Sequence, residues 1–319
     1  MRSACLDLVY ELAAKDERIF FIGSDLGVGV LQKFKEGIPD RFFMEGVSEA
    51  NVVGMAAGLA MEGKVVYVNT IATFLTRRCF EQVVIDLCLH NVQVRLIGNG
   101  GGLVYAPLGP THLAIDDLAI MRSIPNMSIV APADADEMRR LMPQTVDYPG
   151  PIYIRLGKGY DPVVSKAELP FEIGKAIPMR EGKDALLVST GITLQVVLEA
   201  ADVLASRGID VTVLHMHTIK PLDSKAFLRY TAAVPMVVSV EEHTTTGGLG
   251  GSLAEILAEA DLDSIKKFRR IGIPDVFAEE YGSQKSLMAK YGITAERVVD
   301  MVEGLSQGES KKVRGGHDG

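Results

Sequence analysis

Short runs of β-branched and apolar residues alternate along this chain with longer stretches of helical pattern. The short runs predict strands at 19–22, 65–69, 92–97, 128–130, 152–155, 185–189, 211–215 and 236–240. The longer stretches predict helices at 3–15, 49–62, 74–90, 114–122, 134–146, 193–206, 223–232 and 249–260. Strands this short and this apolar are typical of parallel sheets buried on both faces. The alternation therefore predicts an α/β fold built from doubly wound open sheets.

A break in this pattern divides the chain into two predicted domains. Residues 158–183 combine prolines, glycines and mixed charge, which is typical of a linker and leaves room for a short strand pair. Residues 1–157 then form a first domain and residues 184–305 a second. The polar, glycine-rich tail 306–319 is predicted to be disordered. A chain of 319 residues, 47% of them hydrophobic, is long enough for this arrangement.

Charge and cysteine usage exclude several classes of function. A net charge of −8 argues against nucleic acid or an anionic membrane as the main partner, but not against a small phosphorylated substrate. No apolar run approaches the roughly 18 residues of a membrane span, and acidic residues come too early for a signal peptide. Cys5, Cys79 and Cys88 form no CxxC pair, which suggests reduced thiols in a cytoplasmic protein.

The segment 46–63 places one acidic residue, Glu49, at the start of a helix made almost entirely of small and apolar residues. A carboxyl group that enters an apolar pocket can both accept and donate a proton. Small side chains after it also let another backbone approach closely. The alternative is an ordinary helix start, with Ser48 as N-cap and Glu49 stabilised by the helix dipole.

A glycine-rich loop at 98–112 follows the predicted strand 92–97. Its glycines let bare backbone approach a ligand, although neither a GxGxxG turn nor a P-loop lysine is present. His112 ends the loop just before a helix, where a neutral imidazole can donate or accept a hydrogen bond. A purely structural role for this histidine is the alternative.

Two further segments carry candidate chemistry. In residues 73–83, Phe74 and Phe80 could wall a flat heterocycle, while Arg77 and Arg78 could meet a phosphate or a partner's carboxylate. Core aromatics and solvated arginines are the alternative. The run 241–251 is similar to an anion-binding or subunit-contact turn between a strand and a helix, and a structural role is favoured there.

These motifs occur together in the transketolase family. Residues 1–157 resemble its pyrimidine-binding domain, and residues 184–305 resemble its C-terminal domain. The matching runs lie at 23–27, 45–63, 73–83, 109–137 and 241–251. The resemblance therefore implies two open-sheet domains and a thiamine-diphosphate-dependent enzyme.

The resemblance gives specific roles to the candidate residues. Glu49 would hydrogen-bond N1′ of the aminopyrimidine ring of thiamine diphosphate, promoting the imino tautomer that takes the proton from the thiazolium carbon. Phe74 and Phe80 match positions around the pyrimidine ring. His112 matches a family histidine near the cofactor and the donor, so Glu49 and His112 are the predicted catalytic residues. Arg77, also assigned to the cofactor site, stands where many full-length enzymes have an aromatic residue.

Other matched positions concern the substrate and a second subunit. Lys158 falls near a family arginine that binds substrate phosphate, and Asp25 matches an aspartate of a subunit-contact loop near the cofactor. Gly100 and Leu108 stand where full-length enzymes have a histidine and an aspartate that contact the sugar. With Gly101, Gly100 is therefore assigned to a substrate site whose donor specificity need not be that of the pentose phosphate pathway.

One family motif is absent. The sequence contains no GDG…N motif, which supplies the diphosphate and Mg²⁺ site in full-length relatives, and we expect no such domain before Met1. The resemblance therefore implies the C-terminal half of a split transketolase, paired with an N-terminal subunit in an α2β2 assembly. It would transfer a two-carbon ketol unit from a ketose or ketose phosphate to an aldose.

Three other activities stay open at this point. One is chemistry like that of 1-deoxyxylulose-5-phosphate synthase, and another is the β subunit of a 2-oxo-acid dehydrogenase decarboxylase. The third is a non-catalytic regulatory subunit that keeps the fold and has lost the reaction.

Overall fold

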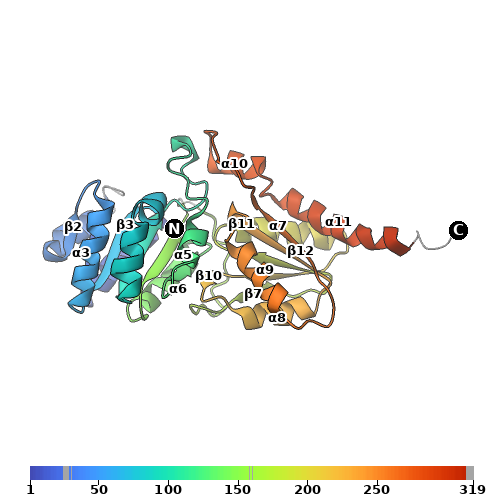
Figure 1. The fold of residues 1–319 in the computed structure, drawn as a ribbon, viewed down its shortest axis with the longest axis horizontal. Coiled ribbons are helices and arrows are strands. Elements are labelled where there is room, and N and C mark those ends of the chain that lie inside the picture. Colours follow the sequence, from blue (N-terminus) through green and yellow to red (C-terminus); the bar gives the residue numbers. More distant parts are fainter. Residues whose placement is uncertain (24–28, 30, 158, 160, 314–319) are drawn as a thin grey trace.

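Two open sheets, one after the other along the chain, form the framework of the protein (Figure 1). The structure is a computed structural model of residues 1–319 and describes all of them except 24–28, 30, 158, 160 and 314–319. Within these described ranges, no helix is long and apolar enough to cross a membrane.

The first sheet has seven strands in the order β10-β5-β6-β4-β3-β1-β2. Their bounds are β1 Ile19–Gly23, β2 Phe42–Met44, β3 Val65–Ile71, β4 Val94–Asn99, β5 Ser128–Val130, β6 Ile152–Leu156 and β10 Thr218–Lys220. All neighbours pair in parallel except β10, which runs antiparallel to β5. Because β10 belongs to the segment predicted as the second domain, the chain crosses the predicted boundary to complete this sheet.

The second sheet has five strands in the order β12-β11-β8-β9-β7. Their bounds are β7 Ile177–Arg180, β8 Ala185–Ser189, β9 Val211–His215, β11 Met236–Thr244 and β12 Lys267–Ile273. Only β7 is antiparallel to its neighbour. Within its described residues, the segment 158–183 contributes the strand β7, which pairs with β9 and not with a local partner.

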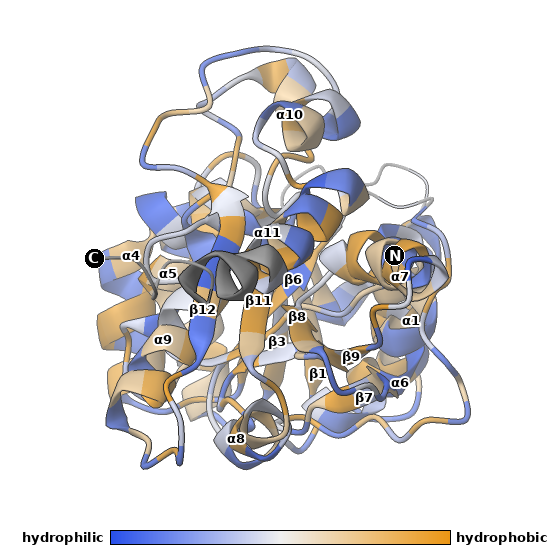
Figure 2. Ribbon diagram, turned by 90° about the vertical axis from the view of Figure 1, so that its right-hand side faces the viewer, coloured by the Kyte–Doolittle hydropathy of each residue, from blue (hydrophilic) through white to orange (hydrophobic). Residues whose placement is uncertain are grey.

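Helices cover both faces of the sheets. They are α1 Arg2–Ala13, α2 Gln32–Gly37, α3 Glu49–Met61, α4 Phe80–Gln82, α5 Asp117–Arg122, α6 Ala135–Thr145, α7 Thr193–Ser206, α8 Ser224–Ala232, α9 Leu249–Glu259, α10 Gln284–Lys290 and α11 Ala295–Val313. In Figure 2, α4, α5 and α9 lie on one side of the strands, and α1, α6 and α7 lie on the other. One hydrophobic cluster runs through both domains, joining Met127 and Ile129 to Met216 and Phe227.

The predicted strands are all present, and every strand that was not predicted lies at a sheet edge. β2 and β10 are the edge strands of the first sheet, and β7 and β12 are the edge strands of the second. Edge strands are short or carry charge because one side of each is unpaired. β12, with the sequence KFRRIGI, is half-exposed and carries three basic residues. Such strands lack the continuous apolar run that identifies a central parallel strand.

One helical prediction needs correction. The predicted helix 74–90 consists of the π-helix η2 (Phe74–Arg78), the short α4 and the π-helix η3 (Val83–Leu89). At the other end of the chain, α11 extends to Val313 and residues 314–319 lie outside the described residues, so the disorder expected of the tail 306–319 stays a prediction.

Candidate active site

The candidate residues follow the carboxyl ends of β2, β3 and β4, which are parallel strands of the first sheet. Parallel strands end at the same edge, so the segments that follow them meet there. β3 is followed at once by η2, which carries Phe74 and Arg78, and β4 by the glycine-rich loop. Insertions that form π-helices are frequent at functional sites because they redirect side chains locally.

Glu49 begins α3 with its side chain almost completely buried, at 4% exposure. Its Oε2 accepts a hydrogen bond from Nη1 of Arg78 over 2.7 Å. The Ser48 hydroxyl donates to the carbonyl of Glu45 at 2.7 Å and does not cap the helix. Ser48 is therefore the N-cap residue of α3 but makes no side-chain capping bond, and the carboxyl group of Glu49 pairs with Arg78.

Arg78 joins Glu49 to two further predicted residues. The guanidinium carbon of Arg78 lies 4.2 Å from the centroid of the Phe74 ring, a cation–π contact. The Phe74 ring meets the His112 ring edge to face at 5.3 Å between centroids. The structure thus brings Glu49, Phe74 and His112 into one row of contacts. Arg78 was not among the predicted site residues, although the sequence pointed to it and Arg77 together as possible anion contacts.

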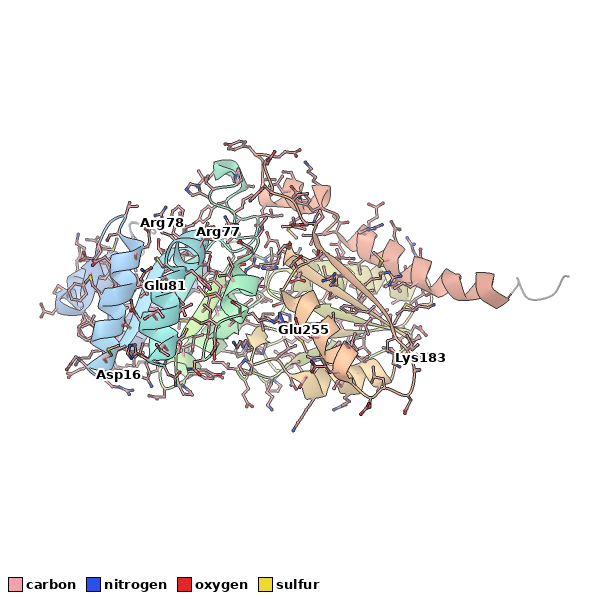
Figure 3. The ribbon with its side chains drawn as sticks, in the orientation of Figure 1. Asp16, Arg77, Arg78, Glu81, Lys183 and Glu255 are labelled. Carbon is pink, nitrogen blue, oxygen red and sulfur yellow. The ribbon has the colours of Figure 1, made fainter. Side chains whose placement is uncertain are left out.

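Arg77 points to a different partner. Its Nε and Nη2 donate to the two carboxylate oxygens of Asp116, with shortest distances of 2.9 and 2.8 Å. The pair lines a cavity of ≈ 410 Å³ that also reaches Thr244 and Phe277 of the second domain. Figure 3 shows Arg77 and Arg78 together at the edge of the first domain. The two neighbouring arginines therefore serve separate contacts.

The other predicted residues lie apart from this row. Phe80 is 37% exposed at the start of α4. Gly100 and Gly101 are buried: a Cβ on Gly100 would overlap the Tyr105 ring, and one on Gly101 would lie 2.5 Å from Arg155. Packing within the chain thus explains why these two positions are glycine. Their assignment to the substrate stays a prediction.

Asp25 and Lys158 lie outside the described residues. The subunit contact expected of Asp25 and the phosphate contact expected of Lys158 therefore also stay predictions.

A buried charged network that was not predicted from the sequence packs against the glycine-rich loop 98–112. Arg155 of β6 donates to both carboxylate oxygens of Asp117, at 2.8 and 3.1 Å, and also to the carbonyl of Glu242 at 2.9 Å. The Tyr153 hydroxyl donates to Asp117 at 2.7 Å. Burial, reinforced by Asp117, raises the pKa of Tyr153 well above its ordinary value. An arginine inside the apolar strand IYIRL was the available signal.

A second buried network lies where the domains meet. Glu137 of α6 and His215 of β9 approach to 3.1 Å, and His217 stacks on Phe171 with 4.0 Å between ring centroids. Burial, with a further contribution from His215, lowers the pKa of His217 to about 3. His217 is thus neutral in the folded protein near neutral pH.

Comparison with known proteins identifies the family of both domains. Residues 1–160 match the family model described as transketolase, pyrimidine binding domain, and residues 174–298 match that of the transketolase C-terminal domain. The first of these matches implies the use of thiamine diphosphate.

The similarity to individual proteins extends along nearly the whole chain. The chain is 36% identical to the 6-deoxy-6-sulfo-D-fructose transketolase subunit SqwH of Clostridium sp. (strain MSTE9), over 94% of this chain and 92% of that protein. It is 37% identical to an apulose-4-phosphate transketolase subunit of Actinobacillus succinogenes, over 86% and 87%. A solved structure titled split gene transketolase, inactive beta4 tetramer, superimposes with a TM-score of 0.85 at 34% identity, over 95% and 96% of the two chains. This chain therefore belongs to the transketolase family and has the domain content of a subunit of a split transketolase.

Proposed function

We propose that this chain is the C-terminal subunit of a split transketolase, which transfers a two-carbon ketol unit from a ketose or ketose phosphate to an aldose. The observation that carries the proposal is the buried carboxyl group of Glu49, which Arg78 links to the Phe74 ring and, through that ring, to His112. A buried carboxyl beside an aromatic face suits a flat heterocycle whose ring nitrogen exchanges a proton.

These residues fit the pyrimidine half of thiamine diphosphate. When bound, the cofactor supplies the electron sink for breaking and making the carbon–carbon bond next to a carbonyl. Glu49 would hold a proton at the ring nitrogen N1′, and Phe74 would offer its face to the ring. His112, half-buried beyond Phe74, would hydrogen-bond the sugar. Arg77, Phe80 and Lys158 keep the cofactor and phosphate roles predicted for them, as part of this proposal.

The diphosphate and Mg²⁺ would be held by a partner chain. Among the residues that the structure describes, no group of three His, Cys, Asp or Glu side chains could hold a metal ion. The sequence also lacks the GDG motif. Relatives named as transketolase subunits, and a similar structure whose title calls its β4 form inactive, support the need for a second kind of chain.

Exposed apolar side chains on the first domain support such an assembly. They come from two stretches, residues 44–61 and 80–89, and comprise Met44, Val47, Met61, Phe80, Ile85 and Leu89. Exposed large apolar side chains of this kind are typical of an interaction surface where they are contiguous. We therefore retain the α2β2 arrangement, in which the active site lies between unlike chains.

The substrate would be a sugar or a sugar phosphate. Two relatives carry names that refer to a sulfonated fructose and to apulose 4-phosphate, which supports a donor outside the common pentose phosphates. Arg77, in its cavity beside Asp116, is a cationic side chain of the site that could meet an anionic end of such a sugar.

The decisive experiment replaces Glu49 by Gln in the complex of this chain with its partner subunit. Glu49→Gln keeps the shape and removes the titrating proton, so ketol transfer is expected to fall by about 10²–10⁴-fold. Glu11→Gln, an exposed glutamate on α1, is the matched control and is expected to retain activity. A loss of less than about tenfold for Glu49→Gln would contradict the proposed role. Turnover of pyruvate, or transfer to a lipoyl carrier, would instead favour one of the two alternative enzymes.

A further inference from the structure

The end of strand β11 in the second domain holds the chain on either side of His112 in the first. Three consecutive residues of β11 bond to backbone groups of the first domain: Glu242 with Leu103, His243 with Ala119, and Thr244 with Ile115, at 2.8, 3.3 and 2.7 Å. His112 lies between Leu103 and Ile115 in sequence. The second domain therefore fixes both ends of the segment that carries the predicted catalytic histidine.

Glu242 makes the closest contact with the glycine loop. Its Oε1 accepts from the Leu103 amide at 2.8 Å and from Nε2 of Gln284 at 2.9 Å. Gly102, with φ of 65°, lies directly on the carboxyl group, and a Cβ there would be 2.5 Å from Cδ of Glu242. Glycine at position 102 thus allows both the left-handed backbone and the close approach of the carboxyl group.

A second contact lies at the other end of the loop. Tyr281 covers Gly109, whose added Cβ would be 2.8 Å from the tyrosine ring. Tyr281 and Gln284 belong to one short stretch at the start of α10, so this stretch touches the loop near Gly109 and supports Glu242 near Leu103. In Figure 1 the loop and α10 stand side by side at the same edge of the molecule.

We propose that Glu242 is a positioning residue, through which the second domain holds the loop 98–112 in the form that presents its backbone and His112 to the sugar substrate. This inference rests on the proposed function for the identity of the substrate. It gives the second domain, which carries none of the predicted cofactor residues, a part in sugar binding. Glu242 itself is buried and acts through the loop.

The carboxyl group of Glu242 is buried, so its hydrogen bonds to Leu103 and Gln284 cannot be replaced by bulk water. Burial raises the pKa of Glu242 to about 7, against the opposing effect of Arg155. A buried acceptor that serves a backbone amide leaves that amide without a partner when it is removed. Truncation of Glu242 therefore acts on the loop first, through the Leu103 amide.

The chain offers a closely matched control in the preceding residue. Glu241 is also buried on β11 and also accepts two hydrogen bonds, from the amides of Leu249 and Gly250 at 2.7 and 2.9 Å. Both of its donors belong to the second domain. Glu241→Ala thus removes a buried carboxyl group of the same kind without touching the loop.

The test compares Glu242→Ala, Glu242→Gln and Glu241→Ala in the assembled complex. Hydrogen–deuterium exchange without substrate is expected to accelerate in peptides covering 98–112 for Glu242→Ala only. The KM for the donor sugar is expected to rise about tenfold, with kcat within about threefold and thiamine diphosphate affinity unchanged, as removal of a uniformly used binding contact predicts. Glu242→Gln keeps an acceptor oxygen and is expected to restore most of the wild-type KM.

Equal effects of Glu241→Ala and Glu242→Ala on loop exchange and on KM would overturn the proposal, as would unchanged exchange in Glu242→Ala. Gln284→Ala, which removes one support of Glu242 at a half-buried position, gives a milder version of the same test if Glu242→Ala does not fold. A wild-type complex that binds no thiamine diphosphate would refute the proposed function instead, while loop exchange would still report on Glu242.

Discussion

Arg78 contacts both side chains that are proposed to hold the aminopyrimidine ring, Glu49 and Phe74. Its guanidinium donates to Glu49 at 2.7 Å and lies over the Phe74 ring at 4.2 Å. Under the proposed function, Arg78 competes with the cofactor for the carboxyl group of Glu49. Arg78→Met removes the hydrogen bond and the charge but keeps a long apolar side chain against Phe74. The variant is therefore expected to bind thiamine diphosphate more tightly than the wild type.

The size of the effect follows from the exposure of the pair. A hydrogen bond to a charged group contributes about 1.5–3 kcal/mol when buried, and exposed ion pairs contribute about 0–1 kcal/mol. Glu49 is buried but the Arg78 side chain is 46% exposed, which places the pair near the lower range. A contribution of about 1 kcal/mol corresponds to a roughly fivefold change in the dissociation constant.

Isothermal titration of the assembled complex with thiamine diphosphate and Mg²⁺ measures this change directly. Arg139→Met, which breaks the exposed pair with Asp136 on α6, is the matched control and is expected to leave affinity unchanged. Affinity that stays within about twofold of the wild type would refute the competition between Arg78 and the cofactor. Weaker binding would mean that Arg78 contributes to the bound state.

Two further predictions concern the buried networks between the domains. Asp117→Asn leaves the buried Arg155 without its counter-charge, so the free energy of unfolding in urea is expected to fall by about 3–5 kcal/mol, and a loss below about 1 kcal/mol would contradict this. Burial and His215 lower the pKa of His217 to about 3 from its ordinary value of 6.5, so the unfolded chain takes up a proton that the folded chain does not. The free energy of unfolding therefore decreases as the pH falls from about 6.5 towards 3. Between pH 7 and 5 the wild type is expected to lose about 2 kcal/mol more than His217→Asn in urea titrations, and parallel losses would show that another group is responsible.

The central strands and the start of α3 were predictable because their signals are local. A strand between two neighbours is buried on both faces, so its own residues are continuously apolar. The edge strands β2, β7, β10 and β12 escaped prediction because an unpaired side relaxes that requirement. Glu49 was recognised as a candidate because one carboxylate stands before a helix of small residues. The family resemblance then followed from several such motifs in a fixed order.

Only the tertiary structure decided which side chains meet. Leu103 and Glu242 are 139 residues apart in the chain, and Arg78 and Glu49 are 29 apart. No local pattern encodes such a pairing, since it depends on how the sheets and loops are placed in space. By itself the sequence determined the layers, the order of the motifs and the family. Tertiary packing determined that Arg78 rests on Glu49 and that Glu242 supports the loop, because each bond requires two distant parts of the chain to meet at the same point.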